Sequence, residues 1–158
     1  METEKAPLDF RVAHPRQPAH PSIDRAQIDT LVETFYGRIA EHPRLGPIFE
    51  SWLGGTWGPH LAKMKRFWAT VLLKTGEYKG RPVPEHYKLR GGLESEDFQL
   101  WLKLFQKTAY DVLEDEEAAP IVIRQAEKIA SSLWLAIFGD PFNTPPAFLT
   151  GNDHKPEE

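Results

Sequence analysis

Cysteine is absent from this chain of 158 residues. That absence excludes disulfide bonds, thiolate nucleophiles, iron–sulfur clusters and cysteine-based zinc sites. It also excludes a cofactor attached covalently through paired cysteines. Any metal chemistry must therefore depend on the six histidines, on carboxylates, or on a cofactor held without a covalent bond.

Long apolar runs are also missing, since no stretch approaches the roughly 20 residues needed to span a bilayer. The N-terminal stretch METEKAPLDFRVAHPRQPAHPS has no apolar segment typical of a secretory signal. A net charge of −4 and a pI near 5.9 argue against a surface for nucleic acid or for an anionic membrane. We therefore expect a cytoplasmic protein that binds neither.

Several motifs of enzyme chemistry are absent as well. The sequence contains no G-x-x-x-x-G-K-[ST], G-x-G-x-x-G or G-x-S-x-G, so nucleotide binding and acyl transfer have no support. It also lacks H-E-x-x-H, and His60 and His86 have no evident third ligand for zinc. Glu85 is the sequence neighbour of His86, so the two side chains should diverge. A zinc hydrolase is therefore a weak hypothesis.

What the sequence does contain is helical periodicity, which runs through residues 22–138 and predicts one all-α domain. Residues 1–21 and 139–158 each carry four prolines, and we expect a flexible N-terminal arm and a flexible C-terminal tail. The first helix has the clearest apolar stripe. Its members are Ile28, Leu31, Val32, Phe35, Tyr36 and Ile39.

Four long helices are predicted, and capping residues set their boundaries. Ser22, Thr56 and Ser95 are the predicted N-caps, and Gly76 and Gly139 are the predicted stops. The segment RLGPIFESWLGG, between the first two helices, is rich in turn residues and is expected to be a short bend. The predicted helices cover residues 22–43, 56–76, 95–113 and 119–139.

A histidine stands in the short segment GRPVPEHYKLRGG, residues 80–92. Pro84 favours the start of a helix and the pair Gly91–Gly92 favours its end, so at most about two turns fit between them. His86 is then either held out to bind a ligand or a surface histidine, and the second role is the commoner one.

Three other hydrogen-bonding side chains lie in or beside apolar stripes: Tyr36, His60 and Trp101. Each alone has a structural explanation, as a tyrosine at the edge of the core, a solvated histidine of a first turn, or a core tryptophan. Together they would surround an apolar space with donors. That arrangement suits a small polarised ligand held over a metal, with His86 as the metal ligand on the other side.

Five stretches resemble the truncated haemoglobins, and specifically their third group. They are FYGRIAEHPRLGPIF, HLAKMKRFWATVLL, TGEYKGRPVPEH, FQLWLKLF and IASSLW, in family order over residues 22–138. The resemblance implies a shortened globin, in which a two-over-two sandwich of helices surrounds one b-type haem.

The resemblance also implies roles for individual residues. His86 matches the proximal iron ligand, and Tyr36, His60 and Trp101 match the distal residues that face a bound ligand. Lys63 matches the position from which a basic side chain reaches a haem propionate. The other implied haem contacts are apolar: Phe35, Phe49, Met64, Phe67, Trp68 and Phe105.

The expected function is binding of O₂, NO or CO at a five-coordinate haem iron, for redox chemistry on O₂, NO or peroxide rather than bulk oxygen transport. Nitric oxide dioxygenase or peroxidase-like activity would need an external reductase, because the chain has no flavin or nicotinamide motif. The alternative is a helical interaction module that has lost haem or senses it through a partner. The expected assembly is a monomer or weak dimer.

Overall fold

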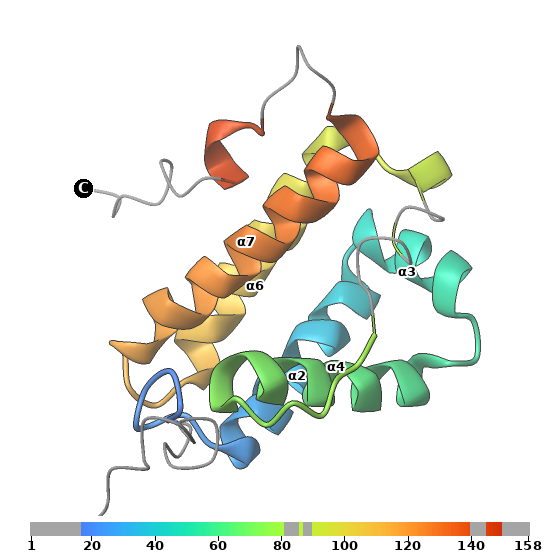
Figure 1. Ribbon diagram of the computed structural model, residues 1–158. Coiled ribbons are helices and arrows are strands. Elements are labelled where there is room, and N and C mark those ends of the chain that lie inside the picture. Colours follow the sequence, from blue (N-terminus) through green and yellow to red (C-terminus); the bar gives the residue numbers. More distant parts are fainter. Residues whose placement is uncertain (1–16, 81–85, 87–89, 140–144, 150–158) are drawn as a thin grey trace, which may run out of the picture.

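The computed structural model describes residues 17–80, 86, 90–139 and 145–149 (Figure 1). Within these residues the regular structure is entirely helical, with five α-helices and two short 3₁₀ turns. No helix in the described ranges is both long and apolar enough to cross a membrane. The elements are α2 (Arg25–Glu41), α3 (Leu45–Leu53), α4 (Trp57–Leu73), η2 (Arg90–Gly92), α6 (Ser95–Val112), α7 (Ala118–Phe138) and η3 (Ala147–Leu149).

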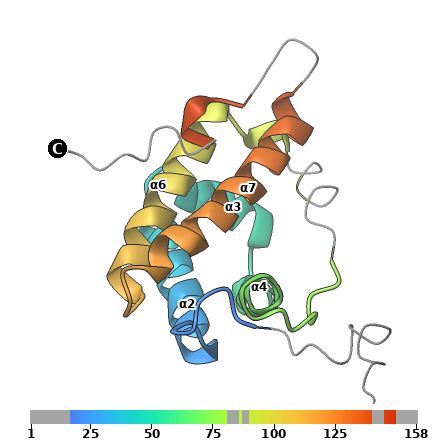
Figure 2. The same cartoon turned by 60° about the vertical axis from the view of Figure 1, so that its left-hand side comes forward.

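Two helix pairs build the body of the protein. A short turn joins α6 to α7, and the two helices pack side by side as an antiparallel hairpin (Figure 1). Helices α2 and α4 form the second pair. Helix α2 also packs on α6 and so connects the two pairs. Figure 2 looks almost along the axis of α4, which crosses the direction of the α6–α7 hairpin.

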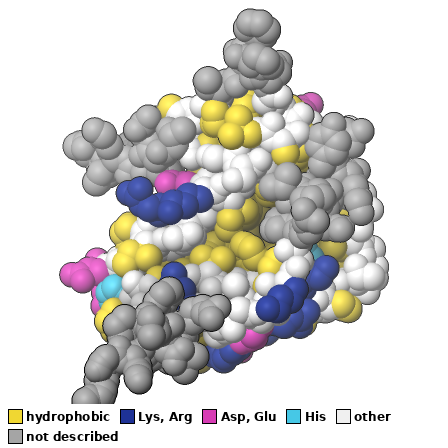
Figure 3. Space-filling model, viewed as in Figure 1, with side chains coloured by type: hydrophobic (Ala, Val, Ile, Leu, Met, Phe, Trp, Pro, Cys, Tyr) yellow, Lys and Arg dark blue, Asp and Glu magenta, His cyan; other side chains and the backbone are white. Residues whose placement is uncertain are grey.

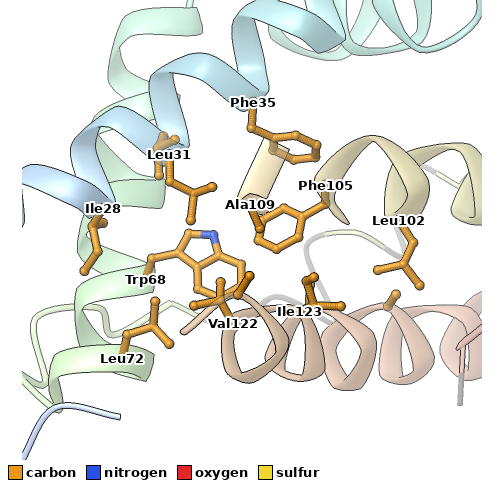
Figure 4. Close-up of a cluster of buried hydrophobic side chains, with 14 of the residues drawn as sticks. Ile28, Leu31, Phe35, Trp68, Leu72, Leu102, Phe105, Ala109, Val122 and Ile123 are labelled. Carbon is orange, nitrogen blue, oxygen red and sulfur yellow. The ribbon is translucent and has the colours of Figure 1, made fainter. Parts of the chain in front are cut away.

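The core forms where these helices meet (Figure 4). All six residues of the stripe predicted for α2 are buried. Trp68 of α4 stacks on Phe105 of α6, with ring centroids 5.3 Å apart and an interplanar angle of 18°. Val122 and Ile123 of α7 close this cluster. Burial of large apolar side chains is the main stabilising term of such a fold.

Helix α3 stands where the sequence predicted a bend, so that prediction was wrong. Pro47 lies in the first turn, where its missing N–H costs nothing. A Cβ at Gly46 would lie 2.6 Å from the Ala40 carbonyl oxygen, so glycine is needed for α3 to begin against the end of α2. The apolar residues recur at helical spacing: Leu45, Ile48, Phe49 and Trp52.

Two predicted N-caps were also wrong. Asp24, not Ser22, caps α2, and its side chain accepts the N–H of Gln27. Glu94, not Ser95, caps α6 through a capping box with Asp97.

The predicted stop of α4 at Gly76 was wrong too, because the helix already ends at Leu73. Lys74 takes the left-handed conformation, with φ of 64°. The Leu72 carbonyl, free of an intrahelical partner at this end, accepts the N–H of Ala19 at 2.7 Å. For α7 the predicted stop at Gly139 agrees with the structure.

Parts of the expected arm and tail pack on the body. The bond from Ala19 to Leu72 places the arm on α4. Leu149 is only 1% exposed, and its carbonyl accepts a hydrogen bond from the Ser131 hydroxyl. The rest of both segments, residues 1–16, 140–144 and 150–158, lies outside the described residues.

Candidate functional site

An apolar cavity of about 320 Å³ lies among α2, α3, α4, α6 and α7. Pockets for small molecules and cofactors commonly have volumes of about 300–1,000 Å³ and apolar walls. Every predicted site residue except Phe105 lines this cavity. The predicted residues brought together here are Phe35, Tyr36, Phe49, His60, Lys63, Met64, Phe67, Trp68, His86 and Trp101.

Phe105 lies one ring behind the wall and does not itself line the cavity. It is 1% exposed and is sandwiched between Trp101 and Trp68, with interplanar angles of 14° and 18°. These near-parallel rings occupy the space that would let Phe105 reach the cavity. Its position supports the two tryptophans that do line it.

Tyr36 presents a buried hydroxyl to the cavity. The side chain is 7% exposed, and its ring lies edge-on to the His60 imidazole, with centroids 5.2 Å apart. Burial raises the pKa of the Tyr36 hydroxyl, which therefore stays protonated. No residue in the described part of the chain bonds this hydroxyl, so a buried donor is left for a ligand.

His60 comes from the first turn of α4 and is half-buried. Burial lowers the pKa of its imidazole to about 4, and interaction with His86 and Lys63 acts in the same direction. The imidazole is therefore neutral near pH 7, with one nitrogen as a donor and the other as an acceptor. Its contact with the Tyr36 ring shows that it faces the cavity rather than solvent.

Trp101, in the second turn of α6, is fixed by aromatic contacts on two sides. Its ring lies edge-on to Phe35 at 5.4 Å and stacks on Phe105 at 5.7 Å. Its indole N–H has no acceptor among the residues that the structure describes, although the side chain is half-buried. A buried indole N–H usually finds a partner, so this donor too is available to a ligand.

His86 reaches the same cavity from the segment that links α4 to α6. It is helical and half-buried. The neighbours that were expected to form a short helix with it, residues 81–85 and 87–89, lie outside the described residues. The cavity therefore contains an imidazole from this segment together with donors from α2, α4 and α6.

An ion pair joins the exposed Arg44 to a buried carboxylate in the cavity wall. Arg44, at the start of α3, donates two hydrogen bonds to the Asp97 carboxylate, at 2.7 and 2.8 Å. Asp97 is 4% exposed, lines the cavity and also accepts the Glu94 N–H. Burial alone would raise the pKa of the Asp97 carboxyl, but the hydrogen bonds from Arg44 and Glu94 and the charge of Arg44 hold it below its usual value.

Replacing Asp97 by asparagine should lower the free energy of unfolding at pH 7 by about 1.5–3 kcal/mol, the range for hydrogen bonds to a charged group. A carboxyl with a lowered pKa in the folded state stabilises fully above its unfolded pKa of about 3.9, and loses that contribution as the pH falls through the folded value. Asp97→Asn should therefore show a weaker loss of stability on acidification below about pH 4.

Urea titrations at pH 7 and below pH 4 measure this difference. Asp29→Asn is the matched control, because Asp29 is exposed on α2 and has no ion pair in the described structure. Equal pH dependence in the two variants would contradict the role given to Asp97.

Sequence reasoning missed half of the cavity wall. Helix α3 contributes four lining residues that the predicted bend concealed, although their helical spacing was a usable signal. Helix α7 and the segments beside α4 and α6 contribute others, which only tertiary packing brings to the site. The missed lining residues are Leu45, Ile48, Trp52, Leu53, Tyr78, Leu93, Asp97, Phe98, Ile129, Ala130, Leu133 and Ile137.

Within the described ranges, neither cavity histidine belongs to a cluster of protein metal ligands. Among the described residues, the one group of three that could hold an ion is His20, Asp115 and Glu117, outside the cavity. There the His20 Nδ1 accepts the Ser22 N–H, so its Nε2 carries the proton in the neutral ring and faces Asp115 at 3.8 Å. His20 is therefore hydrogen-bonded to Ser22, and this group of residues does not support the zinc hypothesis.

Comparison with known proteins identifies the family. No protein-family profile matches the chain. The group 3 truncated haemoglobin ctb of Campylobacter jejuni is 35% identical over 113 residues, which cover 70% of this chain and 87% of that protein. The crystal structure of a group III truncated haemoglobin from Campylobacter jejuni superposes with a TM-score of 0.70 at 33% identity, covering 75% of this chain and 94% of the other. The predicted all-α, shortened globin fold is thus confirmed, and the chain belongs to the group III truncated haemoglobins.

Proposed function

We propose that the cavity holds a b-type haem, that His86 ligates its iron, and that Tyr36, Trp101 and His60 face the ligand on the other side. One observation carries this proposal. Two donors, the buried Tyr36 hydroxyl and the half-buried Trp101 indole N–H, have no partner within the described residues and line the same apolar cavity as His86. Buried polar groups are rarely left unpaired, so this pattern points to a ligand that pairs them.

The walls of the cavity fit a haem. The porphyrin is mostly apolar, so its burial against aromatic and aliphatic side chains supplies affinity. Phe49 of α3 and Met64, Phe67 and Trp68 of α4 provide such surface. Lys63 is exposed at the cavity edge, where its ammonium can pair with a propionate while its stem covers apolar surface.

When bound, haem supplies an iron that takes diatomic ligands reversibly and exchanges single electrons. The protein itself contributes hydrogen-bond donors to the ligand. The hydroxyl of Tyr36 and the N–H of Trp101 would donate hydrogen bonds to a ligand that gains negative charge. His60, with a neutral imidazole, adds a third polar group and contacts the Tyr36 ring. The aromatic wall excludes bulk water from this space.

Such a polar cage favours retention over rapid release of O₂. Each hydrogen bond to a charged acceptor is worth about 1.5–3 kcal/mol, which is roughly a tenfold to hundredfold slower dissociation. The function is therefore redox chemistry on O₂, NO or peroxide rather than bulk oxygen transport. A catalytic version of this chemistry takes electrons from a separate reductase, and rapid turnover of NO with such a reductase would distinguish it from a stoichiometric reaction.

An absorption spectrum tests the proposal directly. We expect the purified protein, expressed with adequate haem, to show a Soret band in the ferric state. The band should shift on reduction with dithionite and shift again to a histidine-ligated carbonyl form when CO is added. Absence of haem uptake under all these conditions would refute the proposal and favour the alternative, a haem-free helical interaction module.

A further inference from the structure

A stripe of basic residues runs along α4 beside the cavity. Lys63, Arg66 and Thr70 follow one another at spacings of three and four, which places them on one face of the helix, and Lys74 comes directly after its end. The three charged members are exposed. Helix α4 contains no acidic residue, although the whole chain has a net charge of −4.

The chain that follows α4 adds a further basic residue to this face. The backbone N–H of Tyr78 donates to the Thr70 hydroxyl at 2.8 Å, so the segment folds back along the helix. Lys79, the next residue, is exposed there. We define Lys63, Arg66, Lys74 and Lys79 as the basic stripe.

Two acidic residues that pack near α4 are already neutralised, and a third, Glu50, accepts the Trp57 indole N–H at the first residue of the helix. Glu33 of α2 pairs with Lys65, and Glu77 pairs with Arg25. In contrast, Lys63, Arg66 and Lys79 have no ion pair with any residue that the structure describes. Lys63 is the proposed partner of a haem propionate, so the charges left for a binding partner here are those of Arg66 and Lys79.

A cluster of acidic residues lies away from α4. Glu114, Glu116 and Glu117 are exposed in the turn between α6 and α7. Figure 3 shows basic side chains gathered at the lower right, along α4, and a second basic group at the left, where acidic side chains also lie. The molecule therefore has a local positive surface that would attract and orient an acidic partner, even though its net charge is negative.

The basic stripe begins at the cavity itself, because Lys63 lines it. We propose that the basic stripe is the docking surface of an acidic protein that donates single electrons to the haem. This inference rests on the proposed function and names the partner that it requires. One electron leaves the donor, which is oxidised by one electron, and reduces the ferric iron to the ferrous state; no bond forms or breaks. A partner held at Arg66 would stand near the cavity edge, where the transfer distance is short.

Reduction of the ferric protein by flavodoxin, a small acidic flavoprotein, tests the inference. The reaction is followed by stopped flow under CO, which traps the ferrous product. We expect the second-order rate constant to fall about tenfold between low and high ionic strength, because salt screens complementary charges. Arg66→Glu should lower it about tenfold at low ionic strength. Lys103→Glu, the same change on an exposed face of α6, should stay within about twofold of wild type.

Zero-length carbodiimide cross-linking supplies a readout that does not depend on electron transfer. Mass spectrometry should find flavodoxin carboxylates joined to Lys74 or Lys79, with fewer cross-links in Arg66→Glu. The Soret band of each variant is measured first, so that a loss of haem, which would contradict the proposed function, is not mistaken for a loss of docking.

Two results would overturn the inference. One is a rate constant that rises with ionic strength in the haem-loaded protein, or that falls equally in Arg66→Glu and Lys103→Glu. The other is cross-links that join the basic stripe to residues 114–117 of a second copy of this chain in place of flavodoxin. That result would identify the stripe as a self-association surface.

Discussion

Replacing His86 by alanine should remove the Soret band of the purified protein. The substitution deletes the imidazole that we propose as the bond between protein and iron, and only apolar contacts would then hold the porphyrin. We expect the haem retained after purification to fall below about a tenth of the wild-type value. The absorbance ratio of the Soret band to the protein band measures it.

Imidazole added to the His86→Ala protein provides the control. Because His86 is half-buried at the cavity, the deletion leaves space in which free imidazole can take its place. Recovery of the Soret band, with unchanged helical circular dichroism, would show that the variant lost a ligand and not its fold. Retention of a wild-type carbonyl spectrum without imidazole would disprove the assignment of His86.

The second large effect concerns O₂ dissociation. Tyr36→Phe removes one hydroxyl and keeps the ring that packs on Phe35 and His60. We expect the dissociation rate of O₂ to rise about tenfold to a hundredfold, which corresponds to one hydrogen bond with a charged acceptor. Trp101→Leu should have a comparable effect. Dissociation of CO, which gains much less charge on binding, should change far less.

Trp134→Phe is the matched control for the tryptophan. Trp134 is also buried, but its indole N–H already donates to the Ser95 hydroxyl at 2.8 Å, and it does not line the cavity. The O₂ dissociation rate of Trp134→Phe should equal that of wild type. Stopped flow measures the O₂ dissociation rates. Wild-type rates in both Tyr36→Phe and Trp101→Leu would refute the proposal that these two donors stabilise bound O₂. A double variant tests whether the two act together, because neighbouring groups need not contribute additively.

The sequence predicted the long helices well because their apolar residues follow a strict period. The stripe of α2, from Ile28 to Ile39, is buried as predicted. The apolar stripes of α2 and α6 include Tyr36 and Trp101, which line the cavity. Helix α3 was missed because Gly46, Pro47 and the pair Gly54–Gly55 are typical of turns. Only the packing of Gly46 against the Ala40 carbonyl explains why glycine stands inside a helix.

The predicted helix ends were wrong for a different reason, because long-range contacts decide where these helices begin and end. Ser95 was a chemically suitable cap, but its hydroxyl accepts the Trp134 indole N–H from α7 instead. The end of α4 coincides with the arrival of Ala19, which is distant in sequence. The pair Arg44–Asp97 joins residues 53 positions apart, and no local pattern announces it.

Because several tryptophans lie around the cavity, the intrinsic fluorescence of the protein should report whether the cavity is filled. Three of its five tryptophans, Trp52, Trp68 and Trp101, line the space proposed for the porphyrin. An excited indole in contact with a strongly absorbing porphyrin passes its energy on instead of emitting light. Intrinsic fluorescence should therefore be dim when the cavity is filled and bright when it is empty. Loading and loss of the cofactor could thus be timed in dilute solution without any label, on the same sample used for the absorption spectrum.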